Sequence, residues 1–170
     1  SNGLERNKGG QNLSDLDLIF NEVQTQELRN FVQQNRMTTN TLFQGVWSFL
    51  LSNYTGSEET TFGVTVSGRP DQLEGADTKV GMYINTLPLR VRTTADQNII
   101  DWLLSIQNEH TKAREFQHLG LNEIKAWTSV KGDFFDSILV FKDYPVDRLL
   151  SKTWALNIEN LHVKEQTNYL

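Results

Sequence analysis

The 170-residue sequence has no cysteine, so neither a disulfide framework nor a thiolate nucleophile is available to it. Long hydrophobic runs are also missing, and none approaches the roughly 18 residues that a membrane-spanning helix needs. Basic residues are fewer than acidic ones, 16 against 21, which gives a formal net charge of −5. A phosphate-binding surface requires the opposite excess. We therefore expect no nucleic-acid partner and no membrane association, and the lack of cysteine is compatible with the cytoplasm.

The sequence does contain enough apolar material for a packed core, with 38% hydrophobic residues and 11 glycines. Strand-like and helix-like apolar patterns follow one another in the order β, α, α, β, β, α, α, β, β. This order predicts an α/β (α+β) fold, a layered sandwich of a mixed β-sheet with helices packed on it. The polar residues 1–12 are expected to form a flexible leader, and residues 13–170 one domain.

The patterns place strands and helices as follows. Strands are expected at 16–20, 60–67, 83–92, 137–141 and 154–163, and helices at 25–35, 41–54, 98–116 and 122–127.

Some of these elements carry further expectations. Thr25 is predicted to cap the first helix, and residues 38–40 the second. The second helix has apolar residues almost all round, which predicts burial on most sides. Gly45 within it predicts close packing against another element. The uninterrupted apolar run 137–141 is typical of a central strand.

A catalytic set is difficult to assemble from the three histidines. His110 has the spacing of a packed or half-exposed helix residue, and His162 lies in an alternating strand and is expected at the surface. His118 follows a helix end, where a loop or capping role is favoured over catalysis. No two histidines have the i, i+4 spacing of a metal pair, and no acidic cluster accompanies them. We therefore predict no metal site.

Two pairs of carboxylates, Glu58-Glu59 and Asp133 with Asp136, lie beside turns. Solvated charge is the favoured interpretation, and an acid/base pair of the glycosidase type is the weaker one. The sequence has neither a nucleophile elbow nor a phosphate-binding glycine loop.

A strand–loop–strand unit, from Phe62 through a polar loop to Arg90, carries the remaining unusual residues. Asn85 interrupts the apolar phase of the second strand, and a buried amide needs partners. Arg69 lies in a stiff turn that suits a fixed ion pair. Pro88 within a strand implies an edge or a bulge. The simpler interpretation is a connection with ordinary turn residues.

Several segments resemble motifs of the condensation domains of nonribosomal peptide synthetases, in the same order and spacing, across nearly all of residues 14–170. They are TVSGRP at 65–70, VGMYINTLP at 80–88 and FDSILVF at 135–141, with further likeness at 40–45, 115–118 and 165–169. The resemblance implies a chloramphenicol-acetyltransferase-like fold of two similar lobes. This chain is similar to the C-terminal lobe and is expected to be truncated at its C-terminus. It departs from the family at Gly120, where proline is frequent, and lacks proline between Tyr169 and Leu170.

The resemblance also implies an activity, amide formation between aminoacyl or peptidyl thioesters held on carrier proteins. The phosphopantetheine arms of those carriers enter a tunnel between the lobes, and no cofactor is expected to bind this chain directly. The family's catalytic motif, two adjacent histidines followed by Asp and Gly, belongs to the N-terminal lobe and is absent here. No catalytic residue is therefore expected, and the chain alone is expected to be inactive.

The same resemblance suggests which residues border the tunnel. A floor loop begins at Ser67, Gly68 and Arg69 and runs to about Gly81, and Met82, Tyr83 and Asn85 follow on the strand beside the tunnel. Gln117 and His118 belong to a loop on the lobe face.

The implied partners are the N-terminal lobe and peptidyl carrier proteins. An apolar face and an unpaired strand edge would let the isolated chain self-associate. Two alternatives remain open: a stand-alone module that binds carrier proteins, and half of an ester-forming acyltransferase of the same fold.

Overall fold

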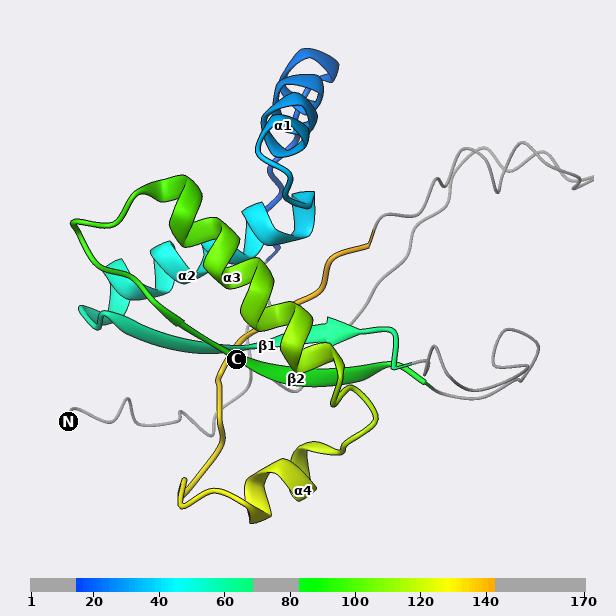
Figure 1. The fold of residues 1–170 in the computed structure, drawn as a ribbon, viewed down its shortest axis with the longest axis vertical. Coiled ribbons are helices and arrows are strands. Elements are labelled where there is room, and N and C mark those ends of the chain that lie inside the picture. Colours follow the sequence, from blue (N-terminus) through cyan, green and yellow to red (C-terminus); the bar gives the residue numbers. More distant parts are fainter. Residues whose placement is uncertain (1–14, 69–82, 143–170) are drawn as a thin grey trace, which may run out of the picture.

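The structure is a computed structural model that describes residues 15–68 and 83–142. Figure 1 shows the course of the chain. The elements are α1 (Glu22–Gln34), α2 (Thr39–Thr55), β1 (Glu59–Val66), β2 (Asn85–Arg92), α3 (Ile99–Arg114), α4 (Leu121–Ala126) and β3 (Ile138–Leu139). Their order follows the sequence prediction from the first helix to the strand near residue 138. The expected leader at 1–12 and strand at 154–163 lie outside the described residues.

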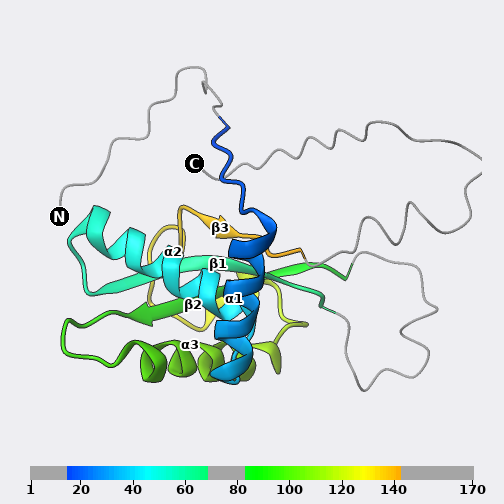
Figure 2. The same cartoon turned by 90° about the horizontal axis from the view of Figure 1, so that it is seen from above.

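The described strands form one mixed sheet in the order β2-β1-β3. β1 and β2 are antiparallel, with Phe62 opposite Leu89 and Val66 opposite Asn85. β3 runs parallel to β1, with Ile138 opposite Gly63. Figure 2 shows the three strands side by side. The predicted mixed sheet is therefore confirmed, and β2, which contains Pro88, lies at an edge of the described sheet.

Helices cover the sheet because its strands alternate apolar and polar side chains. Phe62, Val64 and Leu87 are buried on the face that α2 and α3 cover, and α4 lies on the other side (Figure 1). Period-two alternation places such residues on one face of a strand. The buried cluster continues into α3 through Leu103 and Ile106. Burial of each large apolar side chain contributes about 1.5–3 kcal/mol.

Helix α2 approaches α3 closely at Gly45. A β-carbon there would overlap Cδ2 of Leu103 and lie 3.3 Å from Cζ3 of Trp102. The predicted close packing at this glycine is confirmed.

The helix caps agree only partly with the sequence prediction. Thr38 caps α2, since its Oγ1 accepts a hydrogen bond from the Thr41 amide at 3.1 Å. The cap of α1 is Asn21 and not Thr25, because a capping box joins Asn21 and Gln24 through hydrogen bonds of 2.9 and 3.0 Å. The sequence rule missed Asn21 because it placed the start of the helix one turn too late.

Two expectations about burial and strands are wrong. Residues 16–20 form no strand, and Leu16 is 98% exposed. Helix α2 is not buried on most sides, since Tyr54 is 89% exposed and further apolar side chains on it are exposed as well. The strand expected at 137–141 is shorter than predicted, since only Ile138–Leu139 pair with β1. Its central position stays a prediction, because the strand expected at 154–163 lies outside the described residues.

No helix among the described residues combines the length and hydropathy needed to cross a lipid bilayer.

Candidate functional site

The predicted tunnel residues that the structure describes lie at one end of the β1–β2 pair. Ser67 and Gly68 follow β1, Tyr83 precedes β2, and Asn85 begins β2. Arg69, Gly81 and Met82 lie outside the described residues, so their predicted roles remain predictions.

Gly68 brings the two strand ends together. Its φ of 63° lies in the left-handed region that glycine adopts without steric cost. A β-carbon at this position would overlap the carbonyl oxygen of Tyr83. Both the backbone conformation and this contact therefore require glycine at position 68. The contact holds the end of β1 beside Tyr83, which precedes β2.

Asn85 joins the start of β2 to the turn that follows α3. Its Nδ2 donates to the carbonyl oxygens of Gln117 at 2.9 Å and Leu119 at 2.7 Å. Its Oδ1 accepts from the amide of Thr86 at 2.8 Å. The prediction that this amide needs partners is confirmed, and the bonds bring two of the predicted site segments together.

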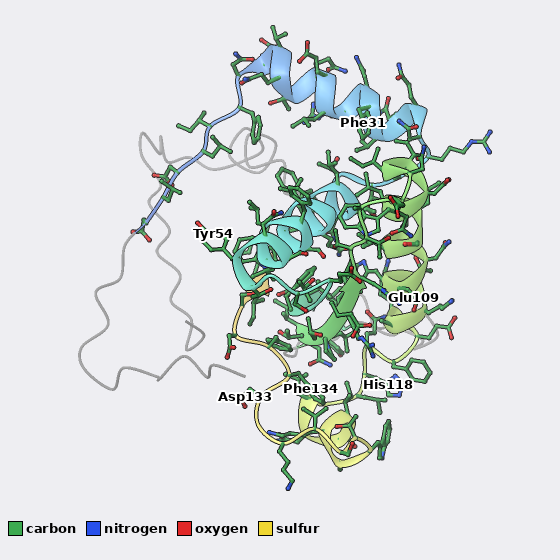
Figure 3. All side chains as sticks on the ribbon, turned by 90° about the vertical axis from the view of Figure 1, so that its left-hand side faces the viewer. Phe31, Tyr54, Glu109, His118, Asp133 and Phe134 are labelled. Carbon is green, nitrogen blue, oxygen red and sulfur yellow. The ribbon has the colours of Figure 1, made fainter. Side chains whose placement is uncertain are left out.

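The turn that Asn85 contacts carries Gln117 and His118. The amide of Gln117 donates to Arg114 at 3.1 Å and that of Leu119 to Phe116 at 2.9 Å, which continues the helical path beyond α3. Gln117 is buried and His118 is exposed, and Figure 3 shows His118 on the chain between α3 and α4. The predicted loop position of His118 is confirmed.

Gly120, the departure from the family pattern, has a structural reason in this chain. Its amide donates to Oε2 of Glu123 at 2.9 Å at the start of α4. Proline has no N–H and would lose this bond. Its φ of −72° is one that any residue adopts, so the hydrogen bond is the feature that proline would change.

Phe135 packs beside Gly63 of β1 on the other face of the sheet, a contact that the sequence analysis does not predict. A β-carbon at Gly63 would lie 2.7 Å from Cε2 of Phe135 and 2.9 Å from Cγ2 of Thr86. Phe135 is 6% exposed. The sequence contains two signs of this contact. Phe135 begins the FDSILVF segment, and Gly63 places a residue without a side chain in the middle of β1.

His110 is a packed helix residue, as predicted. Its Nδ1 lies 3.2 Å from Nε2 of Gln44 on α2. Burial lowers the pKa of His110, and the nearby charge of Arg114 lowers it further. The neutral ring can then accept a hydrogen bond from the Gln44 amide. His162 lies outside the described residues.

Glu58, Glu59 and Asp133 lie in ion pairs across strands or turns. Glu59 accepts two hydrogen bonds from Nη2 of Arg90, at 2.7 and 2.8 Å, and Glu58 lies 3.6 Å from Arg92. The hydrogen bond from Arg90 and its charge lower the pKa of Glu59. Asp133 lies 3.9 Å from Lys125. Glu59 is exposed, as the interpretation of solvated charge predicts, but it lies at the start of β1 and not in a loop.

The ion pair of Glu59 and Arg90 also borders a hollow. A hollow of about 600 Å³ between β2 and α3 is lined in part by the paired Glu59 and Arg90. Among residues 15–68 and 83–142, no group of three His, Cys, Asp or Glu side chains is placed to hold a metal ion.

The sequence matches the Condensation domain family over residues 5–169, and the chain belongs to this family. A linear gramicidin synthase protein of Brevibacillus parabrevis is 40% identical over 157 residues, which cover 91% of this chain and 3% of that protein. Bacitracin synthase 3 of Bacillus licheniformis is 34% identical over 148 residues, 85% of this chain and 2% of that protein. The chain therefore spans only a few per cent of the length of these curated relatives.

Solved structures agree with the fold. One described as the crystal structure of SeMet-CT superimposes with a TM-score of 0.56 at 28% identity, over 61% of this chain and 24% of that chain. The condensation domain from Monacolin K polyketide synthase gives a TM-score of 0.57 at 17% identity, over 69% and 28% of the two chains, a likeness that shows the fold alone. The expected layered, chloramphenicol-acetyltransferase-like fold is confirmed.

Proposed function

We propose that this chain is part of a nonribosomal peptide synthetase condensation domain, in which residues 13–170 belong to the C-terminal lobe. The domain forms amide bonds between aminoacyl or peptidyl thioesters held on carrier proteins. This chain supplies the tunnel floor and the lobe interface, and the N-terminal lobe supplies the catalytic histidine. Membership of the Condensation family and the likeness to peptide synthases support the proposal.

The observation that carries the proposal is the double hydrogen bond from Asn85 to Gln117 and Leu119. It joins two segments that the family resemblance assigns to the site, the strand beside the tunnel and the loop on the lobe face. Channel walls that must align two substrates need such fixed geometry.

The proposed reaction requires this lobe only to align the two substrates and to exclude water. The acceptor amine nitrogen attacks the thioester carbonyl, a C–N bond forms, and the C–S bond breaks to release the phosphopantetheine thiol. The step needs positioning, proton transfer and exclusion of water. Proton transfer is assigned to the N-terminal lobe, and the other two tasks are assigned to this chain.

The proposed contributions of single residues follow the resemblance. The floor and tunnel strand use Ser67, Gly68, Arg69, Gly81, Met82, Tyr83 and Asn85, and the lobe face uses Gln117 and His118. The phosphopantetheine arms belong to the peptidyl carrier partners. The proposed setting is the cytoplasm.

A reconstitution experiment tests the proposal. The chain is mixed with two loaded carrier proteins, with and without a separately produced N-terminal lobe, and the products are identified by mass spectrometry. We expect an amide product only when both lobes are present. Transfer by these 170 residues alone contradicts the proposal.

The same reagents separate the two alternatives. Micromolar binding of a loaded carrier to the chain alone, with no product in any mixture, favours a stand-alone carrier-binding module. A product formed with a hydroxyl acceptor and not with an amine favours an ester-forming enzyme.

A further inference from the structure

We propose that Asn85 is a positioning residue for condensation, which acts by fixing the turn at residues 117–119 against the start of β2. This inference rests on the proposed function. It assigns to one side chain the alignment of the tunnel strand with the loop on the lobe face, and it predicts that the amide group is required in its uncharged, hydrogen-donating form.

The first support is the use of the amide group. Both hydrogen bonds that Nδ2 donates reach backbone carbonyls of the turn, at 2.9 and 2.7 Å, and Oδ1 accepts from the strand itself at 2.8 Å. Carbonyl groups beyond a helix end depend on partners outside that helix. Asn85 provides such partners from a segment 32 to 34 residues earlier in the sequence.

The second support is the rigidity of the strand that holds the amide. Two residues before Asn85, the carbonyl of Tyr83 lies against Gly68, which leaves no room for a β-carbon. One residue after it, Thr86 packs near Phe135 and Gly63 on the other face of the sheet. The amide is therefore anchored on backbone that has little freedom to move.

The third support is what the turn presents. The helical path beyond α3 ends in this turn, in which Gln117 is buried and His118 is exposed. Figure 3 labels His118 there. A shift of the turn would move the exposed side chain relative to the tunnel strand. Displacements of about 1 Å at such positions cost up to a hundredfold in rate.

Asn85→Asp is the decisive substitution. It preserves size and the acceptor for the Thr86 amide, removes both donated hydrogen bonds, and sets a carboxylate against two carbonyl oxygens. The matched control is Asn98→Asp at the start of α3, where Oδ1 only accepts, from the amides of Ile100 and Asp101. Aspartate caps a helix as well as asparagine does.

The variants are compared in the complete synthetase that contains this chain, with loaded carrier proteins as substrates. For Asn85→Asp we expect kcat to fall by about ten- to a hundredfold. The KM for the carrier-bound acceptor should change little, because the lost contacts do not bind the substrate. Asn98→Asp should keep the wild-type values.

The pH profile provides a second readout. Two facing carbonyls raise the pKa of a carboxyl group, and the protonated acid can again donate one hydrogen bond. The rate of Asn85→Asp relative to wild type should therefore rise as the pH is lowered towards about 5. The ratio for Asn98→Asp should stay constant.

Several results would overturn the inference. These are a folded Asn85→Asp enzyme with the wild-type kcat, an equal loss in Asn98→Asp, or a change confined to KM. If Asn85→Asp does not fold, Asn85→Ser replaces it, since a hydroxyl donates one bond and introduces no charge. An intermediate loss of kcat is then expected, and the wild-type rate would contradict the inference.

Failure of the proposed function gives a different result. If the wild-type synthetase forms no amide with any loaded carrier pair, the proposed function and the positioning role both fail. Normal amide formation by wild type and by Asn85→Asp alike removes only the positioning role.

Discussion

Gly45 shows how the absence of one side chain sets the distance between two helices. In most helices alanine is favoured over glycine by about 1 kcal/mol. Here an added methyl group would overlap Leu103 and press on Trp102. Overpacking of this kind costs about 1–3 kcal/mol and outweighs the gain in helix propensity.

We therefore predict that Gly45→Ala lowers the free energy of unfolding by about 1–2 kcal/mol, measured by urea denaturation. The control is the double variant Gly45→Ala with Leu103→Ala. The smaller side chain at 103 makes room for the methyl group, so the double variant should be more stable than the sum of the single effects predicts. Simple additivity would contradict a direct contact.

His110 links stability to pH because its folded pKa is lowered by burial. The unfolded chain then binds more protons than the folded chain below the ordinary pKa of about 6.5. The contribution of His110 to the free energy of unfolding is complete above about pH 6.5 and is lost as the pH falls from there towards the folded pKa. Protonation of Nδ1 would also remove the acceptor for Gln44.

We predict that the urea midpoint falls between about pH 7 and pH 5, and that His110→Gln makes this slope shallower. Glutamine keeps a polar partner for Gln44 and does not titrate. An unchanged slope in His110→Gln would contradict the assignment.

At the scale of an element, the C-terminus of α1 ends in an unusual way. The amides of Arg36 and Met37 donate to the carbonyls of Gln33 and Val32, at 3.1 and 2.9 Å, which is the Schellman pattern. The left-handed position is occupied by Arg36, with a φ of 55°. Glycine is the usual residue there because a β-carbon makes this conformation unfavourable by about 1–2 kcal/mol.

Arg36→Gly should therefore raise the free energy of unfolding by about 0.5–1 kcal/mol, since part of the gain is lost to the greater freedom of the unfolded chain. Arg36→Ala is the matched control, because it also removes the charge but keeps the β-carbon. It should show no such gain. Equal stabilisation by both variants would point to the charge of Arg36 instead.

The elements also show what can and cannot be predicted from sequence. The apolar periodicity of 60–67 and 98–116 located β1 and α3 closely, since both elements bury one face within this chain. The same signal failed for residues 16–20, because apolar content does not say whether a neighbour is present. Asn85 can be identified from sequence as an unusual strand residue, because it interrupts an apolar pattern. Its partners at 117 and 119 could not be predicted, because they depend on where α3 ends in space.

At the scale of the whole molecule, α2 presents an apolar face to the outside. Val46, Phe49, Leu50 and Tyr54 are all exposed, and their spacing places them on one side of the helix. Contiguous apolar patches on a protein surface are typical of interfaces. Self-association of the isolated chain stays a prediction, and this face of α2 is the surface through which we expect it.

We predict that the chain as given forms dimers or larger species at high concentration, measured by light scattering. The double variant Phe49→Lys with Leu50→Lys should shift it towards the monomer, because two charges make the burial of this face unfavourable. Gln26→Lys with Asn30→Lys is the control, since it adds the same charge at exposed polar positions of α1. If both double variants disperse the chain equally, net charge rather than the apolar face controls association. A wild-type chain that is monomeric at every concentration would contradict the prediction outright.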